Sequence, residues 1–215
     1  MIMEEKGLKQ KDVKVKGRFI VLEGGHGSGK TTQAKMLVKY LQDNRVKARY
    51  TKEPYGDDLI PLMSKYSDDL LDSPVLMYLL AASRCIHVRD IKCWIDNGEF
   101  VVCDRYILSS WVYQQIQGIP LNMIRRVNSF VLKPHTTFYI NVPLKERLVR
   151  LRRTHRNRKS FFLENDKLTK EQELYNCLTR DWSEKRYGRL VIISGEVSAT
   201  EVHKKVVNYL IDEIK

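Results

Sequence analysis

Two features are missing from this sequence: a long hydrophobic run and any recognisable pairing of cysteines. No stretch of about 18 consecutive apolar residues occurs in the chain, which excludes a typical membrane-spanning helix. The four cysteines form no Cys-x-x-Cys motif and no metal-ligand spacing, which argues against a disulfide framework or a structural zinc site. They are Cys85, Cys93, Cys103 and Cys177. We therefore expect reduced thiols in a cytoplasmic protein without a membrane partner.

The first 16 residues lack arginine, serine and any sizeable apolar cluster. Five lysines stand there with Glu4, Glu5 and Asp12. A mitochondrial targeting peptide favours arginine and serine and avoids acids, so we assign no targeting signal to this segment. We expect residues 1–16 to form a flexible lysine-rich extension and residues 17–215 to form one domain.

Acidic residues are in deficit, with 26 Asp and Glu against 38 Lys and Arg, which leaves a net charge of +12. Much of the excess lies between Leu144 and Lys159, where Glu146 is the one acid. The basic residues of this segment are Lys145, Arg147, Arg150, Arg152, Arg153, Arg156, Arg158 and Lys159. Such a segment attracts polyanions, so both nucleotide phosphates and nucleic acids are possible ligands.

Residues 24–31 match the phosphate-loop motif G-x-x-x-x-G-K-[ST] over its full length. An apolar run at 19–22 precedes the motif, and apolar residues recur at helical spacing over 34–41, so the context is strand, loop and helix. Backbone N–H groups and the helix N-terminus attract a triphosphate there, Lys30 reaches its β and γ phosphates, and the Thr31 hydroxyl can bind Mg²⁺. The expected ATP-binding residues in this segment are Gly24, Gly25, His26, Gly27, Ser28, Gly29, Lys30, Thr31 and Thr32.

Five strand-like runs alternate with segments of helical length, at 18–23, 47–51, 99–103, 136–142 and 189–194. The longest helical pattern begins near Ser73 and stops at Asn97-Gly98, while Pro143 suits a helix start. Alternating strands and helices predict an α/β protein of the phosphate-loop NTPase type. We expect three layers, with a parallel sheet of about five strands flanked by helices.

Ligands of open parallel sheets bind beyond the carboxyl ends of the strands, so the residues after each strand matter most. Asp104 follows the third strand, where it is suited to holding a Mg²⁺ ion or one of its waters. Arg105 comes next, and its planar guanidinium is suited to binding a phosphate. We therefore predict a Mg²⁺ site at Thr31 and Asp104.

Four motifs are spread over about residues 17–210. They are Phe19-Ile20-Val21-Leu22-Glu23-Gly24 with Gly29-Lys30-Thr31-Thr32-Gln33, then Lys52-Glu53-Pro54-Tyr55-Gly56, then Asp104-Arg105-Tyr106 with Ser109 and Tyr113-Gln114, and finally Lys133-Pro134-His135-Thr136-Thr137-Phe138-Tyr139. In this order they resemble the motifs of thymidylate kinases. The resemblance implies transfer of the γ-phosphoryl group of MgATP to dTMP, which gives dTDP and ADP for deoxynucleotide synthesis.

The resemblance also implies roles for residues of the acceptor site. Arg84, 20 residues before Asp104, would face the thymine carbonyl, Ser110 the base edge, Tyr113 the deoxyribose and Arg105 the monophosphate. The substrate-binding residues implied are Glu53, Pro54, Leu80, Arg84, Arg105, Ser109, Ser110, Tyr113 and Gln114.

The arginine-rich segment resembles the family's lid, expected here at about residues 150–166. Arg150 would stack on adenine. Arg153, Arg156 and Arg158 are candidates for reaching the transferring phosphoryl group, alongside Lys30 and Arg105 as catalytic residues. The resemblance further implies a homodimer, formed through the long helix from Ser73 to Asp96.

Three departures from the family pattern concern the acceptor site and the lid. His26 replaces an acid in the phosphate loop, Leu80 replaces an aromatic ring that stacks on thymine, and Phe161-Phe162 replaces Asp-Arg. An acceptor other than dTMP, such as dUMP, dGMP or a deoxynucleoside, is therefore the near alternative. A nucleic-acid-binding ATPase is the distant one, because no nucleic-acid-binding signature accompanies the basic segment, in which leucines recur at helical spacing.

Overall fold

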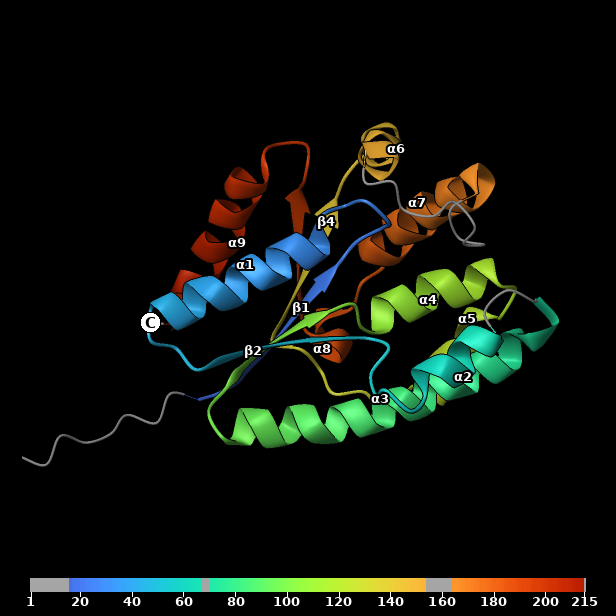
Figure 1. Ribbon diagram of the computed structural model, residues 1–215, viewed down its shortest axis with the longest axis horizontal. Coiled ribbons are helices and arrows are strands. Elements are labelled where there is room, and N and C mark those ends of the chain that lie inside the picture. The colour runs from blue at the N-terminus through green and yellow to red at the C-terminus, as the bar shows by residue number, and fades with distance from the viewer. Residues whose placement is uncertain (1–15, 67–69, 154–163, 215) are drawn as a thin grey trace, which may run out of the picture.

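The computed structural model describes residues 16–66, 70–153 and 164–214, and its centre is a five-stranded sheet (Figure 1). All strand pairs are parallel, in the order β2-β3-β1-β4-β5. The strands are β1 (Arg18–Glu23), β2 (Ala48–Lys52), β3 (Phe100–Asp104), β4 (Thr136–Asn141) and β5 (Arg189–Ser194). The α/β fold with a parallel five-stranded sheet is thus confirmed, and each predicted strand boundary is within one residue of the observed one.

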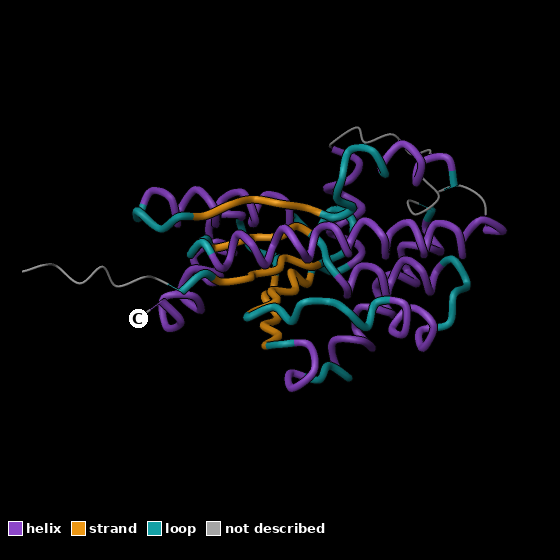
Figure 2. Tube along the Cα trace, turned by 90° about the horizontal axis from the view of Figure 1, so that it is seen from below, coloured by secondary structure: helices purple, strands orange, loops and turns teal. Residues whose placement is uncertain are grey.

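Helices cover both faces of the sheet. They are α1 (Lys30–Asp43), α2 (Ile60–Lys65), α3 (Ser73–Asp96), α4 (Ile107–Ile116), α5 (Leu121–Val127), α6 (Leu144–Arg153), α7 (Asn165–Arg180), α8 (Glu184–Tyr187) and α9 (Ala199–Ile214), with a 3₁₀ turn at Leu70–Asp72. In the turned view of Figure 2, helices extend past one end of the strands. The predicted helix boundaries at Ser73, Asn97 and Pro143 agree with α3 and α6.

Two hydrophobic cores lie on opposite faces of the sheet because side chains alternate along β1. Phe19 and Val21 belong to the core under α3, α4 and α7, and Ile20 and Leu22 to the core under α1 and α9. Burial on both faces explains why the central strands β1 and β3 are almost continuously apolar rather than alternating. The central position of β1 places the loop that follows it in the middle of the sheet's carboxyl edge.

Some expectations lie outside the described residues. The proposed extension falls almost wholly in residues 1–15, and residues 154–163 include most of the expected lid. All four cysteines are described and free; Cys103 is buried and the others are exposed. Within the described ranges, no helix has both the length and the apolarity needed to cross a membrane.

Candidate active site

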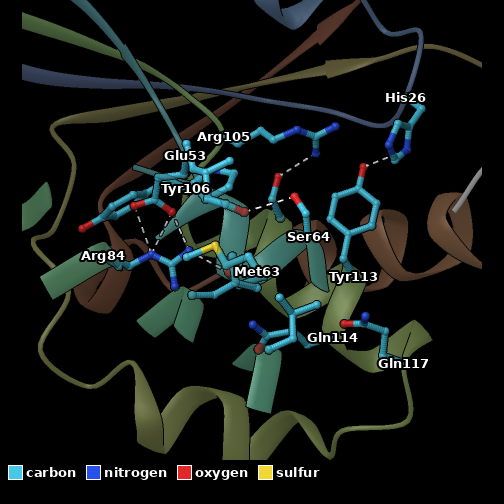
Figure 3. Close-up of a pocket in the computed structure, with 16 residues that line it drawn as sticks. His26, Glu53, Met63, Ser64, Arg84, Arg105, Tyr106, Tyr113, Gln114 and Gln117 are labelled. Carbon is cyan, nitrogen blue, oxygen red and sulfur yellow. Dashed lines mark hydrogen bonds and ion pairs between the residues drawn. The ribbon is translucent and has the colours of Figure 1, made fainter. Parts of the chain in front are cut away.

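A cavity of about 320 Å³ opens at the carboxyl edge of the sheet, between α2, α3 and α4. All nine residues predicted to bind the acceptor line it, although they come from three separate parts of the chain. The remaining lining residues are His26, Ile60, Met63, Ser64, Leu76, Tyr106 and Gln117. Figure 3 shows His26 and Arg105 toward one end of this cavity and Arg84 with Glu53 toward the other.

Arg105 lies in the turn between β3 and α4 with a left-handed backbone, at a φ of 71°. A non-glycine residue in this region is strained, which is most often tolerated at functional sites. Its Nη1 donates to Ser109 Oγ at 3.2 Å, and its guanidinium lies 4.9 Å from the centre of the Tyr113 ring. No carboxylate of the described residues forms a salt bridge with Arg105, so the guanidinium is suited to an external anion.

Glu23 holds this turn in place, a role that the sequence analysis missed. Its carboxylate accepts the Tyr106 N–H at 2.8 Å, the Ser109 N–H at 3.0 Å and the Ser109 hydroxyl at 2.6 Å. Burial raises the pKa of Glu23, although Ser109 and Arg105 act in the opposite direction. The available signal was an acid at the end of an apolar strand, directly before the phosphate loop.

Arg84 projects from α3 into the end of the cavity opposite Arg105 (Figure 3) and is only 2% exposed. Its Nε and Nη2 donate to Glu53 at 2.9 and 2.5 Å, Nη2 donates to Ser110 Oγ at 2.7 Å, and Nη1 donates to the Asn128 side chain. These contacts use about four of the five N–H groups of a guanidinium. Arg84 can therefore offer a ligand about one further hydrogen bond, and its charge is balanced by Glu53.

Glu53 is kept ionised by its neighbours. Burial alone would raise its pKa, but Arg84 and His87 outweigh burial and lower it. His87 is fully buried and connects Glu53, at 3.2 Å from Nδ1, to the Thr51 hydroxyl, at 2.8 Å from Nε2. The ring of Tyr55 stacks on His87 with centroids 4.2 Å apart. His87 thus holds Glu53, and through it Arg84, in place at this end of the cavity.

Gln114 and Leu80 complete that end. Gln114 is 1% exposed, and neither its amide oxygen nor its amide nitrogen has a partner among the described residues. A buried amide left unpaired costs about 1–3 kcal/mol, so this side chain suits a ligand that offers both a donor and an acceptor. Leu80 is half-buried on the wall and supplies an apolar surface without a ring.

The phosphate loop has the backbone expected of it. Gly27 and Gly29 adopt φ values of 78° and 91°, which disfavour residues with a side chain. Lys30 is buried, and its Nζ donates to the Gly25 carbonyl at 3.3 Å. Burial, together with the nearby Arg105, lowers the pKa of Lys30 to about 7. An anion in the loop would restore the charge of this amine.

Thr31 and Asp104 lie together as predicted for a metal site. The Thr31 hydroxyl donates to Asp104 Oδ2 at 2.5 Å, and the Tyr50 hydroxyl reaches the same oxygen at 3.3 Å. Asp104 Oδ1 is buried and has no partner in the described part of the chain. Hydroxyl and carboxylate oxygens beside a phosphate loop suit Mg²⁺, which usually keeps several waters and one or two carboxylate ligands.

A second cavity, of about 340 Å³, lies on the other side of the phosphate loop. Arg150 borders it and donates to the Gly195 carbonyl at 2.7 Å and to Glu146 at 3.2 Å. Gln33, which the sequence analysis did not assign to the site, donates from Nε2 to the Ala199 carbonyl at 2.8 Å. The lining residues are Ser28, Gly29, Thr32, Gln33, Arg150, Gly195, Val197, Ser198, Ala199 and Val202.

His26 lines the first cavity, whereas Ser28 and Thr32 line the second one. Glu171 of α7 accepts hydrogen bonds from the His26 backbone N–H at 3.0 Å and from its Nδ1 at 2.9 Å. Arg147 of α6 and the hydroxyl of Tyr113 also donate to this carboxylate. One buried acid therefore joins the phosphate loop to α4, α6 and α7.

The candidate lid arginines are only partly described. Arg153 is exposed at the end of α6, whereas Arg156, Arg158 and the Phe161-Phe162 pair lie outside the described residues. His135 accepts the Phe19 N–H at Nδ1, at 2.9 Å, which is a structural role at the entry to β4.

Comparison with known proteins gives a consistent result. A family model described as Thymidylate kinase matches residues 22–206. A probable thymidylate kinase of Methanococcus aeolicus is 35% identical over 198 residues, which covers 91% of this chain and 97% of the relative. One from Methanocaldococcus jannaschii is 35% identical over 202 residues, with 91% and 97% covered. A thymidylate kinase of Caldicellulosiruptor saccharolyticus is 33% identical over 209 residues, with 94% and 99% covered.

Proposed function

The chain belongs to the thymidylate kinase family, and we propose that it transfers the γ-phosphoryl group of ATP to dTMP, giving dTDP and ADP. The observation that carries this proposal is the position of the cavity between α2, α3 and α4, called the acceptor cavity from here on, beside the phosphate loop. Arg105, which forms no salt bridge with a described residue, lies at its near end. A nucleoside monophosphate fits this arrangement, because with its phosphate on Arg105 that phosphate lies next to the γ-phosphate of the donor.

Transfer needs charge and alignment more than covalent chemistry from the protein. The loop amides and Lys30 bind the donor phosphates, and Arg105 binds the acceptor phosphate. Thr31 and Asp104 would hold Mg²⁺, whose charge offsets that of the β and γ phosphates when it is bound. The attacking group is already a phosphate anion, so the site needs no strong general base.

Recognition of thymine is assigned to the far end of the cavity. Arg84 supplies its remaining N–H to the base. The Ser110 oxygen accepts a hydrogen bond from Arg84, so its hydroxyl hydrogen stays available for the base. Gln114 offers one amide donor and one amide acceptor that have no partner among the described residues. Tyr113 is assigned to the sugar, and its hydrogen bond to Glu171 restrains its ring. This division predicts that base selection and phosphate binding respond to different substitutions.

The donor nucleotide is assigned to the second cavity, with adenine against Arg150. Arg153, Arg156 and Arg158 remain the candidates that reach the phosphoryl group from a lid at about residues 150–166. Residues 17–215 act as one kinase domain, preceded by the lysine-rich extension, and the enzyme works in the cytoplasm.

A homodimer is supported by apolar residues exposed on α3 and the turn before it. Leu71, Val75, Tyr78 and Ile86 are 87%, 42%, 56% and 39% exposed and recur at helical spacing on one face. Two arginines that suggested a nucleic-acid partner are, by contrast, engaged within the protein. Arg147 pairs with Glu171, and Arg150 with Gly195 and Glu146.

The test is a panel of nucleoside monophosphates, including dTMP, dUMP, dGMP and AMP, incubated with MgATP and scored for ADP release. We expect dTMP to give the highest kcat/KM. Arg105→Ala should impair every acceptor alike, whereas Arg84→Ala should reduce dTMP turnover most. The exposed Arg180 provides the matched control, since Arg180→Ala should change neither. A higher kcat/KM for another monophosphate contradicts dTMP as the acceptor. If both variants reduce the preference among monophosphates equally, the division into a phosphate-binding Arg105 and a base-binding Arg84 is wrong.

A further inference from the structure

His26 occupies the junction of the two nucleotide sites. It is the third residue of the phosphate loop, and its ring lines the acceptor cavity at the end that holds Arg105 (Figure 3). The His26 side chain is 21% exposed, so the ring is accessible from the cavity but largely surrounded by protein. In the proposed reaction, this position lies between the donor phosphates on the loop and the acceptor phosphate on Arg105.

The contacts of the ring define its tautomer. Nδ1 lies 2.9 Å from Glu171 Oε1, which accepts hydrogen bonds, and 3.2 Å from the Tyr113 hydroxyl, which itself donates to Glu171. Nδ1 therefore carries the hydrogen of the neutral imidazole, and a second proton would be added at Nε2. The Tyr113 ring meets the His26 ring edge-on, with centroids 5.2 Å apart.

Charged groups on several elements of the described chain act on His26. Burial lowers its pKa, and the cations Arg105 and Lys30 lower it further, while the Glu171 carboxylate raises it. Arg147 also donates to Glu171, so it weakens the pull of that carboxylate on the imidazole. The balance keeps His26 neutral in the free enzyme at neutral pH.

Bound nucleotides change this balance. The donor's phosphates pair with Lys30 and the acceptor's phosphate pairs with Arg105, so the two cations that oppose a charge on His26 are neutralised by anions of higher total charge. Glu171 stays ionised, because its contacts with His26, Arg147 and Tyr113 outweigh the effect of burial on its pKa. The field at the imidazole then favours the cation.

We propose that His26 takes up one proton from solvent at Nε2 when ATP and dTMP are both bound and then acts as a cation beside the phosphoryl group in transfer. This inference rests on the proposed kinase function. The positive charge on the His26 imidazole then exists only in the complex with both nucleotides, where it balances negative charge on the phosphoryl group in transfer. Glu171 is the positioning residue that orients the imidazole.

The direct test observes the imidazole in the full-length protein. Histidine labelled with ¹³C at Cε1 is titrated in the free enzyme and in the complex with Mg²⁺, dTMP and the β,γ-imido analogue of ATP. His26→Gln identifies the His26 signal among the five histidines, and His26→Asn serves if that variant does not fold. We expect the protonation constant of His26 to rise at least tenfold in the complex. A saturated complex in which His26 stays neutral at pH 7 overturns the proposal.

Steady-state kinetics provide the second readout. We expect His26→Gln to lower kcat on the order of tenfold at pH 7, with less than a twofold change in the KM of either nucleotide. The alkaline decrease of wild-type kcat that follows the loss of the His26 proton should be absent in the variant. An unchanged kcat and pH profile overturns the proposal. A wild-type enzyme without dTMP-dependent ADP release would instead contradict the proposed function, so the two failures are distinguishable.

Discussion

At the scale of single residues, Arg84 shows how a charged side chain can contribute mainly by holding one N–H group in a fixed orientation. Its guanidinium is buried and balanced by Glu53, and most of its N–H groups are already engaged. The remaining N–H is therefore fixed in orientation before a base arrives. Such preorganisation lowers the entropic cost of recognition.

Leu80 lines the cavity that we assign to dTMP, and the proposed function makes it the position at which we expect base affinity to be increased. Leucine covers a base by dispersion and burial but lacks a ring face, and base–aromatic stacking contributes on the order of 1–3 kcal/mol. We predict that Leu80→Phe lowers the KM for dTMP about fivefold or more and leaves the KM for ATP nearly unchanged. Leu62→Phe, on the exposed side of α2, is the matched control. A raised KM for ATP with unaltered dTMP kinetics would place Leu80 outside the acceptor site.

Lys30 predicts a pH dependence of donor binding. Its pKa is lowered to about 7 in the free enzyme, so above pH 7 the amine is largely neutral and must regain a proton to pair with a triphosphate. The Kd for MgATP should therefore rise by up to tenfold per pH unit above pH 7.

Lys30→Arg separates this effect from other titrations, because a guanidinium stays charged throughout the range. We expect its Kd to change little between pH 7 and pH 9 when measured by calorimetry. Lys39→Arg, an exposed substitution on α1, should retain the wild-type slope. Equal slopes in Lys30→Arg and wild type would exclude Lys30 as the titrating group.

The sequence predicted residues that the fold brings to one cavity, but few of the residues that hold them in place. The strand ends bring Arg105 and Gln114 to the cavity, and the strands were recognisable from their apolar, β-branched runs. Glu171 was missed because it lies 145 residues from His26, and only the folded chain brings the two together. Pairings across such distances leave no local pattern in a single sequence, which is also why the bond between Arg84 and Glu53 was not predicted.

At the scale of helices, a buried ion pair joins α6 to α7. Arg147 and Glu171 are each 1% exposed, and Arg147 also donates to the His26 carbonyl at 3.2 Å. Removing one partner leaves an uncompensated buried charge, so Arg147→Met and Glu171→Gln should each lower the free energy of unfolding by about 3–5 kcal/mol. The double variant should lose less than the sum of the two. Urea unfolding of the four proteins measures this coupling, and strict additivity would show that the pair is not coupled.

The same carboxylate makes stability depend on pH. Burial would raise the pKa of Glu171, but His26, Arg147 and Tyr113 lower it below its usual value of 4.5. As pH falls, Glu171 becomes protonated in the unfolded chain before it does so in the folded protein. The ionised Glu171 therefore stabilises the fold fully above about pH 4.5, and this stabilisation is lost as the pH falls towards the lower pKa of the folded state. In Glu171→Gln, the acid limb of the unfolding free energy below pH 4.5 should be shallower.

At the scale of the whole molecule, the exposed apolar face of α3 is suited to a second copy of the chain. Tyr78 lies within this face and is 56% exposed. We predict that Tyr78→Glu converts a dimer to a monomer in sedimentation equilibrium, because the introduced charge would have to be buried at the interface. Tyr209→Glu, at a 42% exposed position on α9, should remain dimeric. A wild-type protein that is monomeric at micromolar concentration would contradict the homodimer.

The acceptor and donor cavities share no lining residue in the described part of the chain. With the nucleotides assigned to these cavities as proposed, we expect either one to enter while the other site is empty and neither to leave before the second arrives. The kinetic scheme that follows is random-order and sequential, with intersecting double-reciprocal lines rather than the parallel lines of a ping-pong enzyme. If the γ-phosphoryl group passes directly from donor to acceptor, the transfer is a single in-line displacement. A chiral, isotopically labelled γ-thiophosphate should therefore be transferred with inversion at phosphorus.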